Sequence, residues 1–82
     1  MTREETRRRI QITAQSEVNS RRYWIALRER HMDTNNNDGI RRAIGHITSH
    51  TDRLSGMATL ASELGFVFHV DEKGKVNVAA RP

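Results

Sequence analysis

Apolar residues recur every three or four positions over residues 39 to 64, which is the strongest periodic pattern in the chain. This spacing places them along one face of an amphipathic helix. Gly65 is suited to end that helix because glycine readily adopts the left-handed backbone of a C-terminal cap. Ser55 and Gly56 are poor helix formers, so a kink in this helix would fall there. The apolar positions are Ile40, Ala43, Ile44, Ile47, Thr51, Leu54, Ala58 and Ala61.

An earlier helix is predicted over about residues 3 to 31. Thr2 followed by Glu5 forms a capping box, and neither proline nor glycine interrupts the segment. Its apolar residues fall on two sides of the helix, and such a helix requires two neighbours, one of them from a second copy of the chain. One side carries Ile10, Ala14, Val18, Trp24, Ile25 and Met32, and the other carries Ile12, Tyr23, Ala26 and Leu27.

Residues 32 to 38, MDTNNND, are predicted to form the loop between the two helices. Asparagine and aspartate favour turns because their side chains bond nearby backbone and because they tolerate left-handed geometry. Asp38 is expected to cap the helix that follows.

The last segment, residues 66 to 80, has the alternating pattern of a β-hairpin. Phe66, Phe68 and Val70 share one face of the first strand, and Gly74 in the DEKG turn supplies a positive φ. A lone two-stranded hairpin is marginal in water, so this face must pack on the helices or extend across a dimer. We therefore predict an α+β fold, residues 1–82 forming one small domain of two long helices followed by a C-terminal hairpin.

Composition strengthens the prediction of a homodimer. Only 35% of the 82 residues are hydrophobic, and a chain this short buries only about 60% of the surface that its unfolded chain exposes when it folds alone. The absence of cysteine excludes disulfides and thiolate metal sites. No apolar run approaches the roughly 20 residues of a membrane span, and no signal peptide is visible, so we expect a cytoplasmic protein that does not bind membranes.

The net charge of +4 lies in the first third of the chain. Residues 1 to 31 hold eight arginines and four glutamates, whereas the remaining residues hold six charges of each sign. The planar guanidinium fork suits phosphate and carboxylate, so this region is the candidate site for nucleic acid or another anionic partner. A solvated helix face is the alternative interpretation of the same charges. The candidate residues are Arg3, Arg7, Arg8, Arg9, Arg21, Arg22, Arg28 and Arg30.

The sequence offers little support for a metal site or a catalytic site. His46 and His50 have the spacing at which two imidazoles can share a metal, but a third ligand is not evident, so we expect no metal and no cofactor. The aspartates at 33, 38 and 52 fit capping and solubility, and no glycine-rich phosphate loop is present. We therefore predict no catalytic residues and no enzymatic activity.

The stretch IRRAIG at 40 to 45 resembles the first motif helix of the lambda-repressor-like helix-turn-helix regulators, and TDRL at 51 to 54 resembles the second. The resemblance implies that Ser49, His50 and Arg53 face DNA. A single helix over residues 38 to 64 is the interpretation that we favour, because His46 and Ile47 occupy the place of the small-residue turn.

These patterns lead to two functional hypotheses. The first is a small basic nucleic-acid-binding regulator or accessory protein that contacts phosphates through its N-terminal arginines. The second is a protein-interaction module, an inhibitor or adaptor, that docks onto an acidic partner. Its interface would centre on Tyr23, Trp24 and Leu27, because tyrosine, tryptophan and arginine are enriched at the energetic centres of interfaces. Packing between helices is the alternative role of Tyr23 and Trp24.

Overall fold

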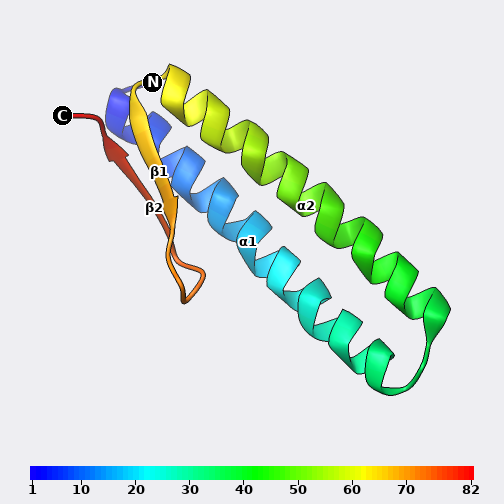
Figure 1. Cartoon of the computed structure of the whole chain (residues 1–82). Helices are drawn as coiled ribbons and strands as arrows, with labels where there is room; N and C mark the ends of the chain where they lie inside the picture. The colour runs from blue at the N-terminus through cyan, green and yellow to red at the C-terminus, as the bar shows by residue number, and fades with distance from the viewer.

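The computed structural model describes residues 1–82 and has an α+β fold. Two helices, α1 (Arg3–Asp33) and α2 (Asn37–Glu63), run antiparallel, and a hairpin of β1 (Phe66–Val70) and β2 (Val76–Ala80) follows them. Figure 1 shows the hairpin lying along only half of the helix pair, the half that contains the N-terminus of α1. The molecule is elongated, with extents of 48 × 20 × 18 Å.

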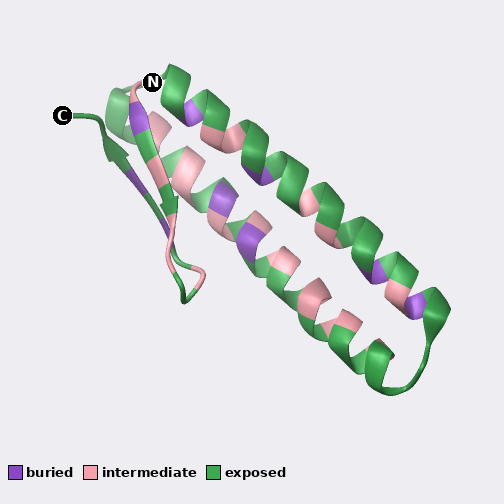
Figure 2. Cartoon of the chain, in the orientation of Figure 1, coloured by how far each residue is buried: buried purple, intermediate pink, exposed green.

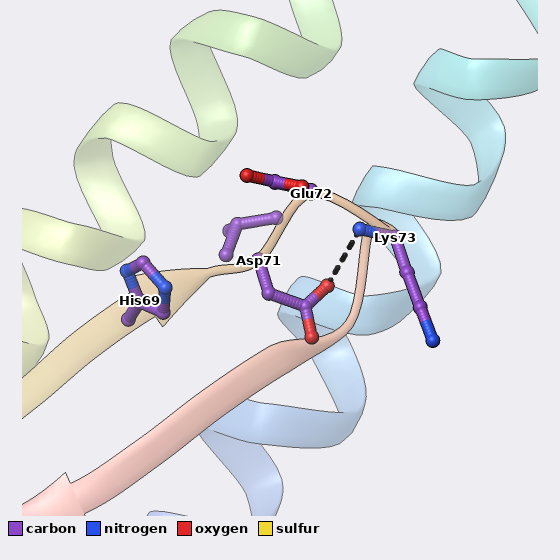
Figure 3. A pocket seen from close by; sticks show the side chains of 5 residues that line it. His69, Asp71, Glu72 and Lys73 are labelled. Carbon is purple, nitrogen blue, oxygen red and sulfur yellow. Dashed lines mark hydrogen bonds between the residues drawn. The ribbon is translucent and has the colours of Figure 1, made fainter.

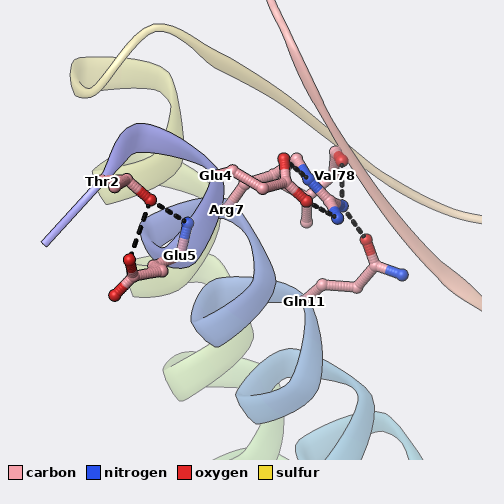
Figure 4. Close-up of polar contacts among 6 residues, drawn as sticks. All are labelled: Thr2, Glu4, Glu5, Arg7, Gln11 and Val78. Carbon is pink, nitrogen blue, oxygen red and sulfur yellow. Dashed lines mark hydrogen bonds and ion pairs between the residues drawn. The ribbon is translucent and has the colours of Figure 1, made fainter.

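The start of α1 is capped by Thr2, as its sequence predicts. The Thr2 hydroxyl accepts a hydrogen bond from the Glu5 backbone N–H at 3.1 Å and donates to the Glu5 carboxylate at 3.1 Å (Figure 4). The reciprocal half of the capping box therefore differs from expectation, because the carboxylate bonds the hydroxyl instead of a backbone amide.

The loop between the helices is shorter than the predicted 32 to 38. Helix α1 continues to Asp33, and Asn35 takes a left-handed φ of 56° that reverses the chain. Asn36, rather than Asp38, caps α2, since its side-chain oxygen accepts from the Gly39 N–H at 3.0 Å. Asp38 lies in the first turn of α2, where its negative charge still favours the positive end of the helix dipole.

Helix α2 runs unbroken from Asn37 to Glu63, so the chain has no break at Ser55 and Gly56. Leu54 and Ala61 are buried on either side of that point, and their packing offsets the roughly 1 kcal/mol that a helical glycine costs. The continuous helix also excludes the helix-turn-helix resemblance, because no turn separates residues 40–45 from residues 51–54.

The hairpin has the predicted strands and turn. Phe66 pairs with Ala80, Phe68 with Val78 and Val70 with Val76, and Gly74 has a φ of +82°. The Asp71 carboxylate accepts from the Lys73 N–H at 2.9 Å (Figure 3). It also accepts from the Lys75 N–H at 2.9 Å, and the two bonds fix the turn.

The core lies where the hairpin covers the helices (Figure 2). Gln15 of α1 joins the two layers, because its side-chain oxygen accepts from the Val76 N–H at 2.7 Å and its amide donates to the Gly74 carbonyl at 2.8 Å. Beyond the hairpin, the half of the helix pair nearest the α1–α2 loop buries only Gly39 and Ala43. No helix is both long enough and apolar enough to cross a membrane. The clustered core residues are Ala14, Val18, Leu54, Ala61, Phe66, Val76 and Val78.

Candidate binding surface

The first candidate arginine, Arg3, binds the end of α2. Its guanidinium donates to the carbonyls of Leu64 and Gly65, each at 3.0 Å, and lies 4.4 Å from the centre of the Phe66 ring. These carbonyls have no partner within the helix, so Arg3 supplies the positive charge that favours a helix C-terminus. Its charge is therefore used to join the start of α1 to the end of α2.

Arg7 holds strand β2 against α1 (Figure 4). Its guanidinium pairs with the Glu4 carboxylate at 2.7 Å, and it also donates to the Gln11 side chain at 2.6 Å and to the Val78 carbonyl at 3.0 Å. The hydrogen bond from Arg7 lowers the pKa of Glu4 below its ordinary value, and the same bond raises the pKa of Arg7. Arg7 is thus a structural contact between the two layers.

Three further arginines also face the fold. Arg22 donates to the Lys73 carbonyl and lies against Gly74 at the hairpin turn. Arg21 and Arg28 are half-buried, and the Arg21 Nε is buried without a hydrogen-bond partner. Position 21 follows buried Ala14 by seven residues, so the two side chains lie on nearly the same side of α1.

The remaining three arginines share the side of α1 that neither α2 nor the hairpin covers. Arg8, Arg9 and Arg30 are exposed, and none forms an ion pair. At 100° per residue they fall within about a third of the helix circumference. Two apolar residues stand among them, Ile12 at 63% exposed and Tyr23 at 62%. We call Arg8, Arg9, Ile12, Tyr23 and Arg30 the outer face of α1.

The length of the outer face sets what it can contact. Arg8 and Arg30 are 22 residues apart, which corresponds to about 33 Å along the helix axis. Glu5 lies on the same side, and its carboxylate accepts a hydrogen bond from the Thr2 hydroxyl. The face is therefore an extended strip on a rigid helix, with two arginines near its start and one near its end.

Two of the three residues of the predicted interface, Tyr23 and Trp24, point in different directions. Tyr23 faces outward and touches Trp24 edge-on, with ring centroids 5.4 Å apart. Trp24 is half-buried and stacks on His46 of α2, with centroids 3.8 Å apart and planes within 7° of parallel. Leu27 is half-buried. Trp24 therefore packs between the helices, and Tyr23 is the aromatic residue available to a partner.

His46 and His50 have different partners. While His46 stacks on Trp24, the His50 Nδ1 lies 2.5 Å from the Glu17 carboxylate, which Arg53 also approaches at 3.6 Å. The sequence pattern does not single out Glu17, although its position one turn after Ala14 places it beside the buried stripe of α1. No group of three or more metal-ligating side chains comes together in the fold.

The largest hollow, about 520 Å³, lies at the hairpin turn among His69, Val70, Asp71, Glu72 and Lys73 (Figure 3). The Asp71 carboxylate is already bonded to two backbone amides of the turn, so its hydrogen bonds stabilise local structure. No protein-family model, curated protein or solved structure matches this chain.

Proposed function

We propose that this protein is a small nucleic-acid-binding regulator or accessory protein that contacts phosphates through the outer face of α1. The observation that carries the proposal is that Arg8, Arg9 and Arg30 are exposed, unpaired and aligned on one uncovered face of a single helix. An unpaired guanidinium at the surface is free to exchange its hydration and counterions for a phosphate.

The dimensions of the strip suit a duplex. The 33 Å or so between Arg8 and Arg30 is close to one turn of B-DNA, about 34 Å, so both ends of α1 can reach phosphates of the same duplex when the helix lies along it. The Tyr23 hydroxyl lies between them as a further donor to a phosphate oxygen. Contacts of this kind carry no base information, so binding is expected to depend little on sequence.

Arg3, Arg7 and Arg22 have a different role in this proposal. Each donates to a backbone carbonyl of the second half of the chain, which keeps the hairpin and the end of α2 against α1. Their removal would act through stability rather than through lost phosphate contacts. Arg21 and Arg28 are half-buried and contribute to the potential at the surface rather than to direct contacts.

An acidic protein partner is the second candidate. The exposed side chains of Ile12 and Tyr23 favour it, because phosphate binding gives no reason for an exposed isoleucine within the strip. Apolar and aromatic groups surrounded by arginine are typical of the centre of a protein interface. In that case truncating Ile12 and Tyr23 would weaken binding more than removing the arginines.

We further propose that the functional unit is a homodimer. Only nine of 82 residues are buried, and several large apolar side chains remain exposed. Ile44 is 46% exposed and precedes Ser62 by five helical turns, so it lies on the side of α2 where Ser62 bonds Arg81 beside the hairpin. The hairpin extends along only half of the helices (Figure 1). The surface around Ile44 is therefore uncovered, and we propose that a second copy packs there.

Fluorescence anisotropy with a labelled duplex of about 20 base pairs tests the phosphate proposal. The triple variant Arg8→Ala, Arg9→Ala, Arg30→Ala is compared with Arg41→Ala, Arg42→Ala, Lys75→Ala, which removes the same charge from α2 and the hairpin. We expect the first variant to weaken binding at least tenfold and the second to weaken it much less. Equal losses would show that net charge, and not the outer face, drives the association.

A further inference from the structure

A second surface lies on the side of the helix pair that faces away from the hairpin. Here Ile10, Met57 and Leu60, with Arg9 and Thr13, line a hollow of about 230 Å³ between α1 and α2. Arg9 and Thr13 are each two residues from Gln11, which is a rotation of about 200° around α1. Gln11 belongs to the side that holds β2, so this hollow faces the opposite way.

The hollow continues toward the end of the helix pair. One turn further along, Leu64 at the C-terminal cap of α2 follows Leu60, and Thr6 precedes Ile10 on α1. Leu64 and Thr6 line a second hollow of about 150 Å³ together with Met1, Arg3 and Phe66. Leu60 is 50% exposed and Met1 is 75% exposed, so the apolar lining is open to a partner. We call the two hollows together the apolar groove.

The charged residues that line the apolar groove are arginines, Arg9 in the first hollow and Arg3 in the second. Arg9 is exposed at its edge and forms no ion pair, and no carboxylate lines either hollow. The next turn of each helix brings Glu17 and Arg53, but the Glu17 carboxylate already contacts both His50 and Arg53. Arg53 holds it only at 3.6 Å and remains 59% exposed, so its guanidinium can bind a second carboxylate.

We propose that the apolar groove binds an acidic amphipathic helix of a partner protein. Leucine-like side chains of that helix would enter the two hollows, and its Asp or Glu residues would meet Arg9 and Arg53. A helix with an apolar face against a groove and charges at its edges is a recurrent mode of peptide recognition. The charge argues against a second copy in this groove, because no carboxylate lines either hollow to meet the Arg9 of the other copy.

This site goes beyond the proposed function and lies on a separate surface. The outer face of α1 and the apolar groove share only Arg9, which stands at the border between them. Binding of the acidic helix is therefore independent of Arg8, Arg30 and Tyr23.

A pair of designed peptides of about 18 residues tests the proposal with the full chain. Both carry leucines at helical spacing on one face; one has glutamates flanking that face, and the other has lysines at the same positions. The Met57 methyl signal in a ¹H–¹³C spectrum reports on the groove, and calorimetry gives the affinity. We expect the glutamate peptide to shift the Met57 signal and to bind at least tenfold more tightly than the lysine peptide.

Variants at exposed positions locate the binding site without disturbing the core. Leu60→Asn should weaken the glutamate peptide at least fivefold, and Arg53→Gln should weaken it by a smaller factor, while Ile12→Asn on the outer face should leave it unchanged. Circular dichroism melting confirms that each variant folds, and duplex binding of Leu60→Asn should remain as in the wild type. Equal affinity for both peptides, an unmoved Met57 signal, or no effect of Leu60→Asn would overturn the proposal. A dimer that dissociates in Leu60→Asn would assign the groove to a second copy instead.

Discussion

The indole of Trp24 lies flat against the imidazole of His46, with the ring centroids 3.8 Å apart and the planes within 7° of parallel. This stack joins α1 to α2 in the half of the helix pair that the hairpin does not cover, where few other residues are buried. The contact therefore holds the two helices together far from the core, where few other side chains join them.

Trp24→Ala should destabilise the fold by about 1–3 kcal/mol, because it removes the largest side chain from this contact. Tyr23→Ala is the matched control, since the neighbouring ring is mostly exposed and its loss should cost about 0.5 kcal/mol or less. Urea unfolding followed by circular dichroism measures both. Equal losses would mean that the stack contributes nothing specific to the helix pair.

Two glycines of α2, Gly39 and Gly45, should respond to alanine with opposite signs. A Cβ on Gly39 would lie 2.6 Å from the His31 ring, whereas a Cβ on Gly45 meets no atom within 4 Å. We expect Gly39→Ala to destabilise the protein by about 1–2 kcal/mol through displacement of His31, and Gly45→Ala to stabilise it by about 0.5–1 kcal/mol. The double variant His31→Ala, Gly39→Ala should recover most of the loss. A stabilising Gly39→Ala would show that the imidazole moves away without cost.

The ion pair between Arg7 and Glu4 makes a small, pH-dependent contribution to stability. The Arg7 hydrogen bond lowers the pKa of Glu4 from its ordinary value of 4.5. Because the folded pKa is the lower one, the contribution is fully present above pH 4.5 and is lost as the pH falls through the folded value. Carboxyl chemical shifts followed by NMR should show Glu4 titrating below pH 4.5, and Arg7→Ala should return it toward that value. An unchanged titration in Arg7→Ala would contradict the assigned cause.

The proposed homodimer predicts a mass of roughly twice 9.4 kDa in sedimentation equilibrium. Ile44→Asp should shift the equilibrium to the monomer, because burying an unpaired carboxylate costs several kcal/mol. Ser49→Asp, which adds the same charge to an exposed position of α2, should leave the dimer intact. A wild-type mass of 9.4 kDa at every concentration would exclude the dimer.

Sequence periodicity predicts the elements of this fold well, because each element is specified by local pattern. The stripe from Ile40 to Ala61 forms one helix, and both Gly65 and Gly74 have the positive φ that their positions in a cap and a turn require. The exact cap is less predictable. Asn36 and Asp38 are both good N-cap residues, and the left-handed turn at Asn35 determines which of them begins α2.

The sequence is much less able to predict which arginines form bonds within the fold and which remain free. Arg3 and Arg7 bond carbonyls 61 and 71 residues away, and no local pattern reveals such contacts. The contact between Glu17 and His50 spans 33 residues and is hidden for the same reason. The sequence therefore locates the basic helix, whereas the packing of α2 and the hairpin decides which of its charges remain free.

The salt dependence of duplex binding tests the central claim most directly. For B-DNA the slope of log affinity against log salt falls by about 0.9 for each phosphate contact removed. Wild type is compared with the variant Arg8→Ala, Arg9→Ala, Arg30→Ala between about 50 and 200 mM salt. We predict a shallower slope in the variant, by about 0.9 for each of these arginines that binds a phosphate. An unchanged slope, or no binding of wild type to duplex, single strands or RNA at 50 mM salt, would contradict phosphate binding by the outer face of α1.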